Sequence, residues 1–139
     1  MIVADASFAY ALLDDSDVGF AAARAWYEAW YPDLITTPLV LSEVDHLATR
    51  RLGARARSSF RADVAAGGYH VAWWGSATEE CVRVAERYVD LGVSLTDASL
   101  VALAARLETT SIATFDERHF RAMQPLTGEP AFTLLPLDA

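Results

Sequence analysis

Short apolar runs alternate along the chain with longer stretches in which apolar residues recur at helical spacing. The short runs are typical of buried strands, and the longer stretches are typical of helices that pack on one face. Strands are expected at residues 2–4, 34–37, 69–74, 111–114 and 132–135. Helices are expected from about residue 6 to 13 and over 18–31, 38–52, 54–66, 77–91, 97–107 and 117–123. Strands separated by helices predict an α/β domain with a mostly parallel, about five-stranded sheet.

Two of the expected helices carry capping signals at their starts. Ser76 and Glu79 have the spacing of a capping box, which predicts that they open the helix over 77–91. Thr96 is expected to cap the helix over 97–107.

The length of 139 residues corresponds to a single domain, which we expect to span residues 1–139. A single cysteine, Cys81, cannot form an intrachain disulfide, and this favours a reducing compartment such as the cytoplasm. No apolar run reaches the roughly 18 residues of a transmembrane helix, so no membrane contact is expected. The first residues also lack the basic start of a signal peptide.

The charge of the chain argues against simple nucleic-acid binding. Nineteen acidic and 11 basic residues give a net charge of −8, and every basic residue is an arginine. Nucleic-acid binders are usually basic. One short stretch without acids nevertheless contains five arginines: Arg50, Arg51, Arg55, Arg57 and Arg61. This stretch is either a solvated helical face or a local basic patch on an acidic body.

Four acidic residues are expected near the carboxyl ends of the strands, where a parallel sheet binds its ligands. Asp5 directly follows the first expected strand, and Asp116 lies just past the fourth. Glu43 lies in the helix after the second strand, and Asp97 starts a later helix. Because ligands bind at the carboxyl ends of the strands, these side chains are expected close together. Each acid also has an ordinary explanation: helix caps for Asp5 and Asp97, a turn for Asp116. A solvated helix position would explain Glu43.

The surroundings of Asp5 and Glu43 favour a metal site. Both lie among apolar residues, and a buried carboxylate is costly unless it is paired or binds a cation. Several acids around one point repel one another unless a cation neutralises them, and oxygen ligands suit Mg²⁺ or Mn²⁺. The absence of lysine excludes phosphoaspartate receivers and haloacid-dehalogenase-type phosphatases, which use a lysine beside the phosphoryl group. No phosphate-binding GxxxxGK[ST] loop is present.

Four segments together resemble the PIN domain, and more narrowly the VapC toxin family. They are residues 2–7 (IVADAS), 37–44 (TPLVLSEV), 95–100 (LTDASL) and 113–120 (ATFDERHF). The resemblance covers nearly the whole chain, and each segment carries one of the four acids. Any one segment is a weak signal, whereas four in the expected order are a strong one.

The resemblance implies a fold and an activity. The implied fold is a three-layer α/β/α sandwich, and the implied activity is metal-dependent hydrolysis of RNA phosphodiesters by a toxin endoribonuclease. Asp5, Glu43 and Asp97 would bind Mg²⁺ or Mn²⁺ directly. Asp116 would bind a second, weaker metal or orient the attacking water.

Further residues are expected to support this site. Ser7 and Thr96 would hydrogen-bond a ligating carboxylate or a phosphate oxygen, or else cap their helices. Arg50, Arg51 and Arg55 are expected to contact RNA phosphates. His46 and His119 lie near site acids in the sequence, but neither is assigned a role.

The resemblance also implies partners: a VapB-like antitoxin and a second copy of the chain in a homodimer. One helix carries four aromatic residues that would serve either the core or such an interface: Trp26, Tyr27, Trp30 and Tyr31. Two other functions remain open from the sequence. One is a PIN nuclease of RNA processing that is not a toxin, and the other is a PIN-like binding module without catalysis.

Overall fold

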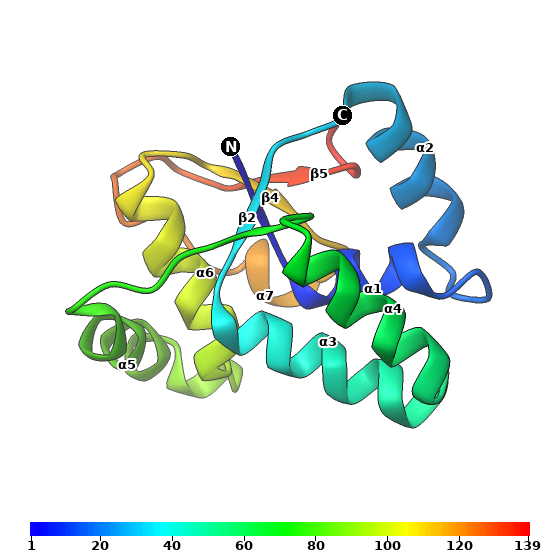
Figure 1. The fold of residues 1–139 in the computed structure, drawn as a ribbon. Helices are drawn as coiled ribbons and strands as arrows, with labels where there is room; N and C mark the ends of the chain where they lie inside the picture. Colours follow the sequence, from blue (N-terminus) through cyan, green and yellow to red (C-terminus); the bar gives the residue numbers. More distant parts are fainter.

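The computed structural model describes all 139 residues and contains five strands, seven α-helices and a short 3₁₀ helix (Figure 1). The strands are β1 (Ile2–Ala4), β2 (Leu34–Thr36), β3 (His70–Val71), β4 (Ser111–Ala113) and β5 (Thr133–Leu135). The helices are α1 (Ala6–Leu13), α2 (Phe20–Trp30), α3 (Pro38–Arg51), α4 (Ala54–Ala65), α5 (Ala77–Arg87), η1 (Val89–Leu91), α6 (Leu95–Arg106) and α7 (Glu117–Phe120).

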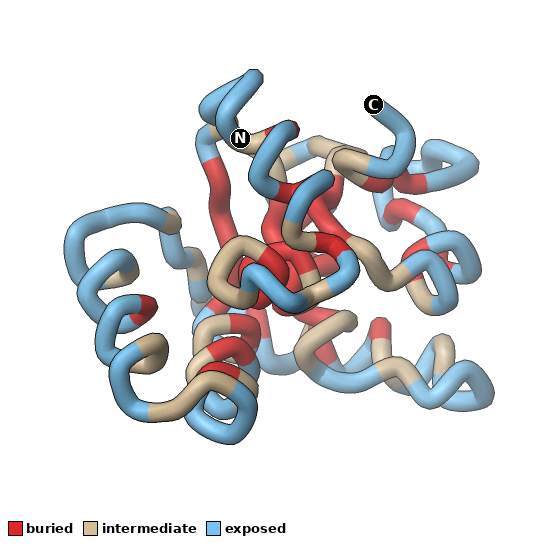
Figure 2. The backbone as a smooth tube through the Cα atoms, turned by 90° about the vertical axis from the view of Figure 1, so that its right-hand side faces the viewer, coloured by how far each residue is buried: buried red, intermediate tan, exposed pale blue.

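The five strands form one sheet in the order β3-β2-β1-β4-β5, and every pair is parallel. Alternate strand residues point to opposite faces. Val3 and Ile35 pack in a core cluster with residues of α5 and α6. Ala4 and Leu34 pack in a second cluster with residues of α1 and α2. Helices therefore cover both faces, which confirms the expected three-layer α/β/α sandwich, and the strands β1, β2 and β4 form its buried centre (Figure 2).

The order of the strands brings several chain segments to one edge of the sheet. The chain moves outward from β1 through β2 to β3 and then returns to place β4 on the other side of β1. Such a reversal leaves a crevice at the carboxyl ends of the strands. In Figure 1, β1 and β2 run down toward the end of the molecule where α1, α3 and α7 begin.

The third strand is much shorter than expected. The aromatic run at 69–74 predicts six residues of strand, but only the exposed edge pair His70–Val71 joins the sheet. The following residues leave the sheet to pack against helices. Trp74 donates a hydrogen bond from its indole to Glu80, and the guanidinium of Arg106 lies 5.2 Å from its ring centroid. The side chain of Trp74 thus packs against helices, whereas Trp73 is 43% exposed, and neither residue extends the strand.

The expected capping box at Ser76 is wrong, and so is the uninterrupted helix after it. Ser76 has φ −98° and ψ 8°, outside the extended region that an N-cap adopts, and its hydroxyl donates to Glu80 over 2.8 Å. The α-helix α5 ends at its C-cap, Tyr88, and the separate 3₁₀ helix η1 follows it. The Tyr88 hydroxyl accepts a hydrogen bond from the backbone N–H of Gln124, which ties this break to a distant loop.

The cap of α6 also differs from the expectation. Ser94, not Thr96, is the N-cap, since the Ser94 hydroxyl accepts a 3.1 Å hydrogen bond from the backbone N–H of Asp97. The helix therefore begins two residues earlier than predicted and places Asp97 in its first turn. The other elements begin and end within three residues of their expected limits. None of the helices is both long and apolar enough to cross a membrane.

Candidate metal centre

A cleft of about 720 Å³ opens at the carboxyl ends of β1 and β4. All four acids singled out in the sequence line it, and we call them the site acids: Asp5, Glu43, Asp97 and Asp116. They come from the loop after β1, from α3, from the first turn of α6 and from the loop after β4. Segments separated by up to about a hundred residues in sequence are thus brought to one point by the parallel sheet.

Asp5 is the most buried of the site acids and is only 4% exposed. It occupies the N-cap position of α1 but makes no side-chain cap hydrogen bond. Its Oδ2 instead accepts hydrogen bonds from the hydroxyls of Ser7, over 2.8 Å, and Thr114, over 2.7 Å. Both hydroxyls therefore bind the same carboxylate oxygen of Asp5. Burial raises the pKa of Asp5, although the two hydroxyls oppose this and the charge of Asp97 adds to it.

The surroundings of Glu43 and Asp97 in the cleft raise the pKa values of both carboxyl groups. Glu43 is an exposed residue, unlike Asp5, but partial desolvation of its carboxylate raises its pKa, and the charges of the other three site acids raise it further. Burial also raises the pKa of Asp97, with an added contribution from Asp116 and an opposing one from His119. Mutual repulsion of this kind disfavours the ionised forms, and a bound cation would relieve it.

Asp116 and His119 sit together where β4 leads into α7. Asp116 is the N-cap of α7, and its Oδ1 accepts a hydrogen bond from the backbone N–H of His119 over 3.2 Å. Its backbone N–H donates to the Thr114 hydroxyl over 2.9 Å. The His119 ring reaches into the cleft, where its Nδ1 lies 3.0 Å from Oδ2 of Asp97 and 3.3 Å from Oδ2 of Asp116.

The structure adds three residues to the site to which the sequence assigned no role: Thr114, His119 and Asp17. Thr114 ends a strand, where a β-branched residue has an ordinary explanation. His119 stands three residues after Asp116, but its approach to Asp97 spans 22 positions and leaves no local signal. Asp17, from the turn before α2, also lines the cleft, and its carboxylate accepts a 2.8 Å hydrogen bond from the backbone N–H of Gly19.

The two expected supporting residues have different surroundings. Ser7 hydrogen-bonds the carboxylate of Asp5, and its hydroxyl also accepts from the backbone N–H of Phe115 over 3.0 Å. Thr96 is not among the residues that line the cleft. Its backbone carbonyl accepts a 2.6 Å hydrogen bond from Ser99, and its hydroxyl has no protein partner.

The arginine stretch divides into groups with different neighbours. Arg51 lines the cleft, and its guanidinium lies 5.3 Å from the ring centroid of Tyr10. Arg50 and Arg55 are exposed and do not line the cleft. Arg61 pairs with Asp45 through two contacts of 2.7 and 3.0 Å.

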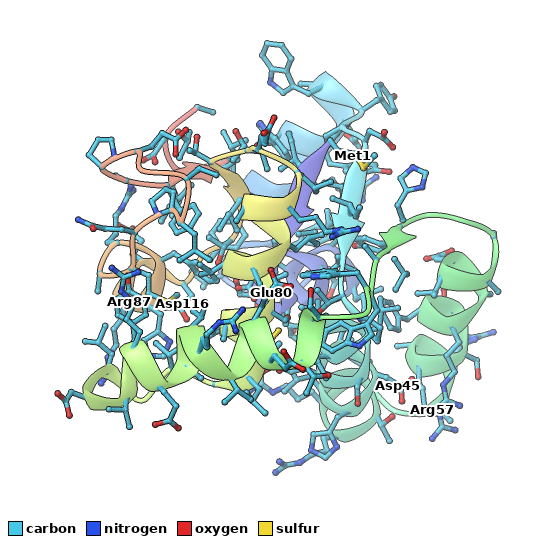
Figure 3. All side chains as sticks on the ribbon, turned by 90° about the vertical axis from the view of Figure 1, so that its left-hand side faces the viewer. Met1, Asp45, Arg57, Glu80, Arg87 and Asp116 are labelled. Atoms are coloured by element: carbon cyan, nitrogen blue, oxygen red, sulfur yellow. The ribbon has the colours of Figure 1, made fainter.

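The pairing of Arg61 belongs to a charged group away from the cleft. Asp45 and Arg57 lie near each other by the α3–α4 hairpin, well separated in this view from Asp116 (Figure 3). Part of the basic stretch is therefore neutralised by a neighbouring acid, and Arg51 is the member of the stretch that lines the same cleft as the site acids.

The aromatic residues of α2 also divide. Trp26 is buried and packs edge-on against Phe8, with ring centroids 5.5 Å apart. Trp30 and Tyr31 are 72% and 76% exposed. Trp26 is therefore a core residue, whereas the side chains of Trp30 and Tyr31 are accessible to another protein.

Comparisons with known proteins agree with this fold and site. The family model of the PIN domain matches residues 2–124. The chain therefore belongs to the PIN-domain family. Within that family the chain is similar to Ribonuclease VapC26 of Mycobacterium tuberculosis (strain ATCC 25618 / H37Rv). The two sequences are 32% identical over 136 residues. The aligned region covers 97% of this chain and the whole of that protein.

A solved structure has the same fold. The crystal structure of Mycobacterium tuberculosis VapC20, described as a Sarcin-Ricin loop cleaving toxin, superposes with a TM-score of 0.80. The match covers 88% of this chain and 94% of the other, at 24% sequence identity.

The donor set of the cleft fits a divalent cation. The site acids offer carboxylate oxygens, which are the ligands that Mg²⁺ and Mn²⁺ prefer. Oxygen or nitrogen atoms of Asp97, Asp116 and His119 lie within 4.8 Å of one another, close enough to share one ion. Burial and, to a smaller extent, the charges of neighbouring acids raise the pKa values of Asp5, Glu43 and Asp97, and a bound cation would favour their ionised forms.

Proposed function

We propose that this protein is a Mg²⁺- or Mn²⁺-dependent endoribonuclease and the toxin of a toxin–antitoxin pair. The observation that carries the proposal is the convergence of the four site acids on one cleft at the carboxyl edge of the sheet. The relatedness to Ribonuclease VapC26 over nearly the full length of both chains supports RNA as the substrate. The similarity of fold to a toxin that cleaves an RNA loop points the same way.

In this proposal Asp5, Glu43 and Asp97 hold the cation, and Asp116 binds a second ion or orients the attacking water. A bound divalent ion supplies Lewis acidity toward a phosphoryl oxygen and lowers the pKa of water. The protein supplies positioning. Ser7 and Thr114 both donate hydrogen bonds to Oδ2 of Asp5, and these bonds hold the carboxylate in one orientation.

The negatively charged phosphates of RNA need basic side chains to bind them beside this acidic site. Arg51 lines the cleft and is placed to contact a phosphate next to the scissile bond. Arg50 and Arg55 would contact the strand further out, because they are exposed and lie beyond the cleft. Thr96, in the first turn of α6, would bind a phosphate oxygen or support Asp97.

The proposal includes two protein partners and a location. A VapB-like antitoxin would neutralise the enzyme, and a second copy of the chain would form a homodimer. The exposed Trp30 and Tyr31 are the residues we assign to one of these interfaces, since aromatic residues are enriched there. In this proposal the enzyme acts in the cytoplasm, which the single unpaired cysteine, Cys81, favours.

Induced expression followed by mapping of RNA 5′ ends tests the proposal. We expect growth arrest and new RNA ends with the wild-type chain, and neither with Asp97→Ala. Growth arrest without new ends would contradict the ribonuclease assignment. New ends confined to precursor RNAs, without arrest, would favour an RNA-processing enzyme over a toxin.

A further inference from the structure

The ring of His119 is built into the acidic cleft and is not a surface histidine. Its side chain is 19% exposed. The helix that carries it, α7, is anchored by the buried Phe120 next in sequence and by the Asp116 cap at its start. The ring is therefore held on the side of the cleft where α6 and α7 meet.

The distances around His119 match those between ligands of one metal ion. Nδ1 lies 3.0 Å from Oδ2 of Asp97 and 3.3 Å from Oδ2 of Asp116. Neighbouring ligands of an octahedral ion with bonds of about 2.1 Å are separated by about 3 Å. Asp116 uses Oδ1 for the cap of α7, so Oδ2 is the oxygen left to face Nδ1.

We propose that His119 binds, through Nδ1, the ion that Asp116 holds, and that Asp97 is the third protein ligand of that ion. This inference rests on the metal-dependent function proposed above and adds a nitrogen to its all-carboxylate ligand set. In this role the imidazole is neutral, with its proton on Nε2, because a ligating nitrogen must offer its lone pair. The hydrogen bond between Nδ1 and Asp97 then exists only without the ion.

A nitrogen ligand changes which ions the site prefers. Mg²⁺ takes oxygen ligands almost exclusively, whereas imidazole is a good ligand for transition-metal ions. The site is therefore expected to bind Mn²⁺ more tightly than Mg²⁺, and His119 is the source of that preference. Removing the imidazole should lower the affinity for Mn²⁺ by at least about tenfold and change the affinity for Mg²⁺ much less.

His119→Asn separates ligation from mere positioning. The asparagine amide still has an N–H to donate toward Asp97. If its carbonyl oxygen binds the ion instead, that oxygen gives no imidazole ¹⁴N coupling and no preference for Mn²⁺ over Mg²⁺. His46→Asn is the matched control, because His46 is exposed on α3 three residues after Glu43 and does not line the cleft.

The test is pulsed electron paramagnetic resonance of Mn²⁺ bound to the purified protein, with calorimetric titrations of Mn²⁺ and Mg²⁺. We expect the ¹⁴N coupling of a directly bound imidazole in the wild type and in His46→Asn, and its loss in His119→Asn. Bound Mn²⁺ without that coupling, or equal loss of affinity for both ions in His119→Asn, would overturn the role of His119 alone. Absence of any Mn²⁺ binding would overturn the metal-dependent function as well.

Discussion

The Thr114 hydroxyl donates a 2.7 Å hydrogen bond to the carboxylate of Asp5, 109 positions away in the sequence. The bond joins the ends of β1 and β4 and is completely buried on the Thr114 side. The same hydroxyl accepts the backbone N–H of Asp116, so one side chain orients two of the site acids.

Replacing Thr114 should therefore weaken metal binding without removing a ligand. We expect Thr114→Val to lower Mn²⁺ affinity by about 10- to 100-fold, the usual effect of losing a partner of a ligand. It should also lower the free energy of unfolding by about 1–3 kcal/mol, because buried groups lose their hydrogen bonds. Titration calorimetry and urea unfolding measure the two effects. Thr133→Val, at an exposed position of β5, is the control, and equal Mn²⁺ affinity in both variants would remove Thr114 from the site.

The raised pKa of Asp97 makes a prediction about stability against pH in the metal-free protein. A folded-state pKa above the unfolded value of 3.8 means that the folded state binds the proton more tightly. The free energy of unfolding therefore falls as the pH rises from about that value through the raised pKa. Asp97→Asn removes this contribution, so the variant should melt at a higher temperature than the wild type at pH 7 in EDTA.

Thermal melts between pH 4 and 8 check this prediction, with Glu117→Gln as the exposed control. The advantage of Asp97→Asn should shrink toward acidic pH and vanish when Mn²⁺ is added. A variant that melts below the wild type at pH 7 in EDTA would show that Asp97 is not under electrostatic stress.

The different positions of Arg50 and Arg51 predict different effects on RNA binding. Both lie in the last turn of α3, but only Arg51 lines the cleft. In an Asp97→Asn background that blocks cleavage, Arg51→Gln should lower RNA affinity and reduce the slope of log affinity against log salt by roughly 0.7–1. Arg50→Gln should change both less. A larger effect from Arg50 would place the RNA path outside the cleft.

The cap of α6 offers a direct test of the structure against the sequence expectation. Loss of an N-cap hydroxyl lowers the free energy of unfolding by about 1 kcal/mol. Ser94→Ala should show this loss in urea unfolding, whereas Thr96→Ala should show little, because only Ser94 accepts the N–H of Asp97. The opposite order would restore Thr96 as the cap.

The sequence was sufficient for the fold and for the gathering of the four site acids because both depend on local order. Hydrophobic periodicity reveals which segments are strands, and parallel strands present their carboxyl ends on one edge. An acid just after such a strand, like Asp5, is thereby placed in the cleft.

Features that depend on pairs of distant residues were not predictable. The contact of His119 with Asp97 requires the relative placement of α6 and α7. The short β3 depends on Trp74 finding Glu80 and Arg106 instead of the sheet. Neither relation has a period or spacing that a single sequence displays.

Cleavage of a defined RNA by the purified protein, measured against Mn²⁺ concentration, tests the account most directly. We expect no cleavage in EDTA, activity on adding Mn²⁺ or Mg²⁺, and a loss of at least about 100-fold in Asp5→Asn and Asp97→Asn at saturating metal, as expected when a metal-binding carboxylate is lost. Glu117→Gln, exposed beside Asp116 and outside the cleft, should match the wild type. Cleavage that persists in EDTA, or full activity in folded Asp97→Asn, would contradict the assignment of the site acids to a catalytic metal.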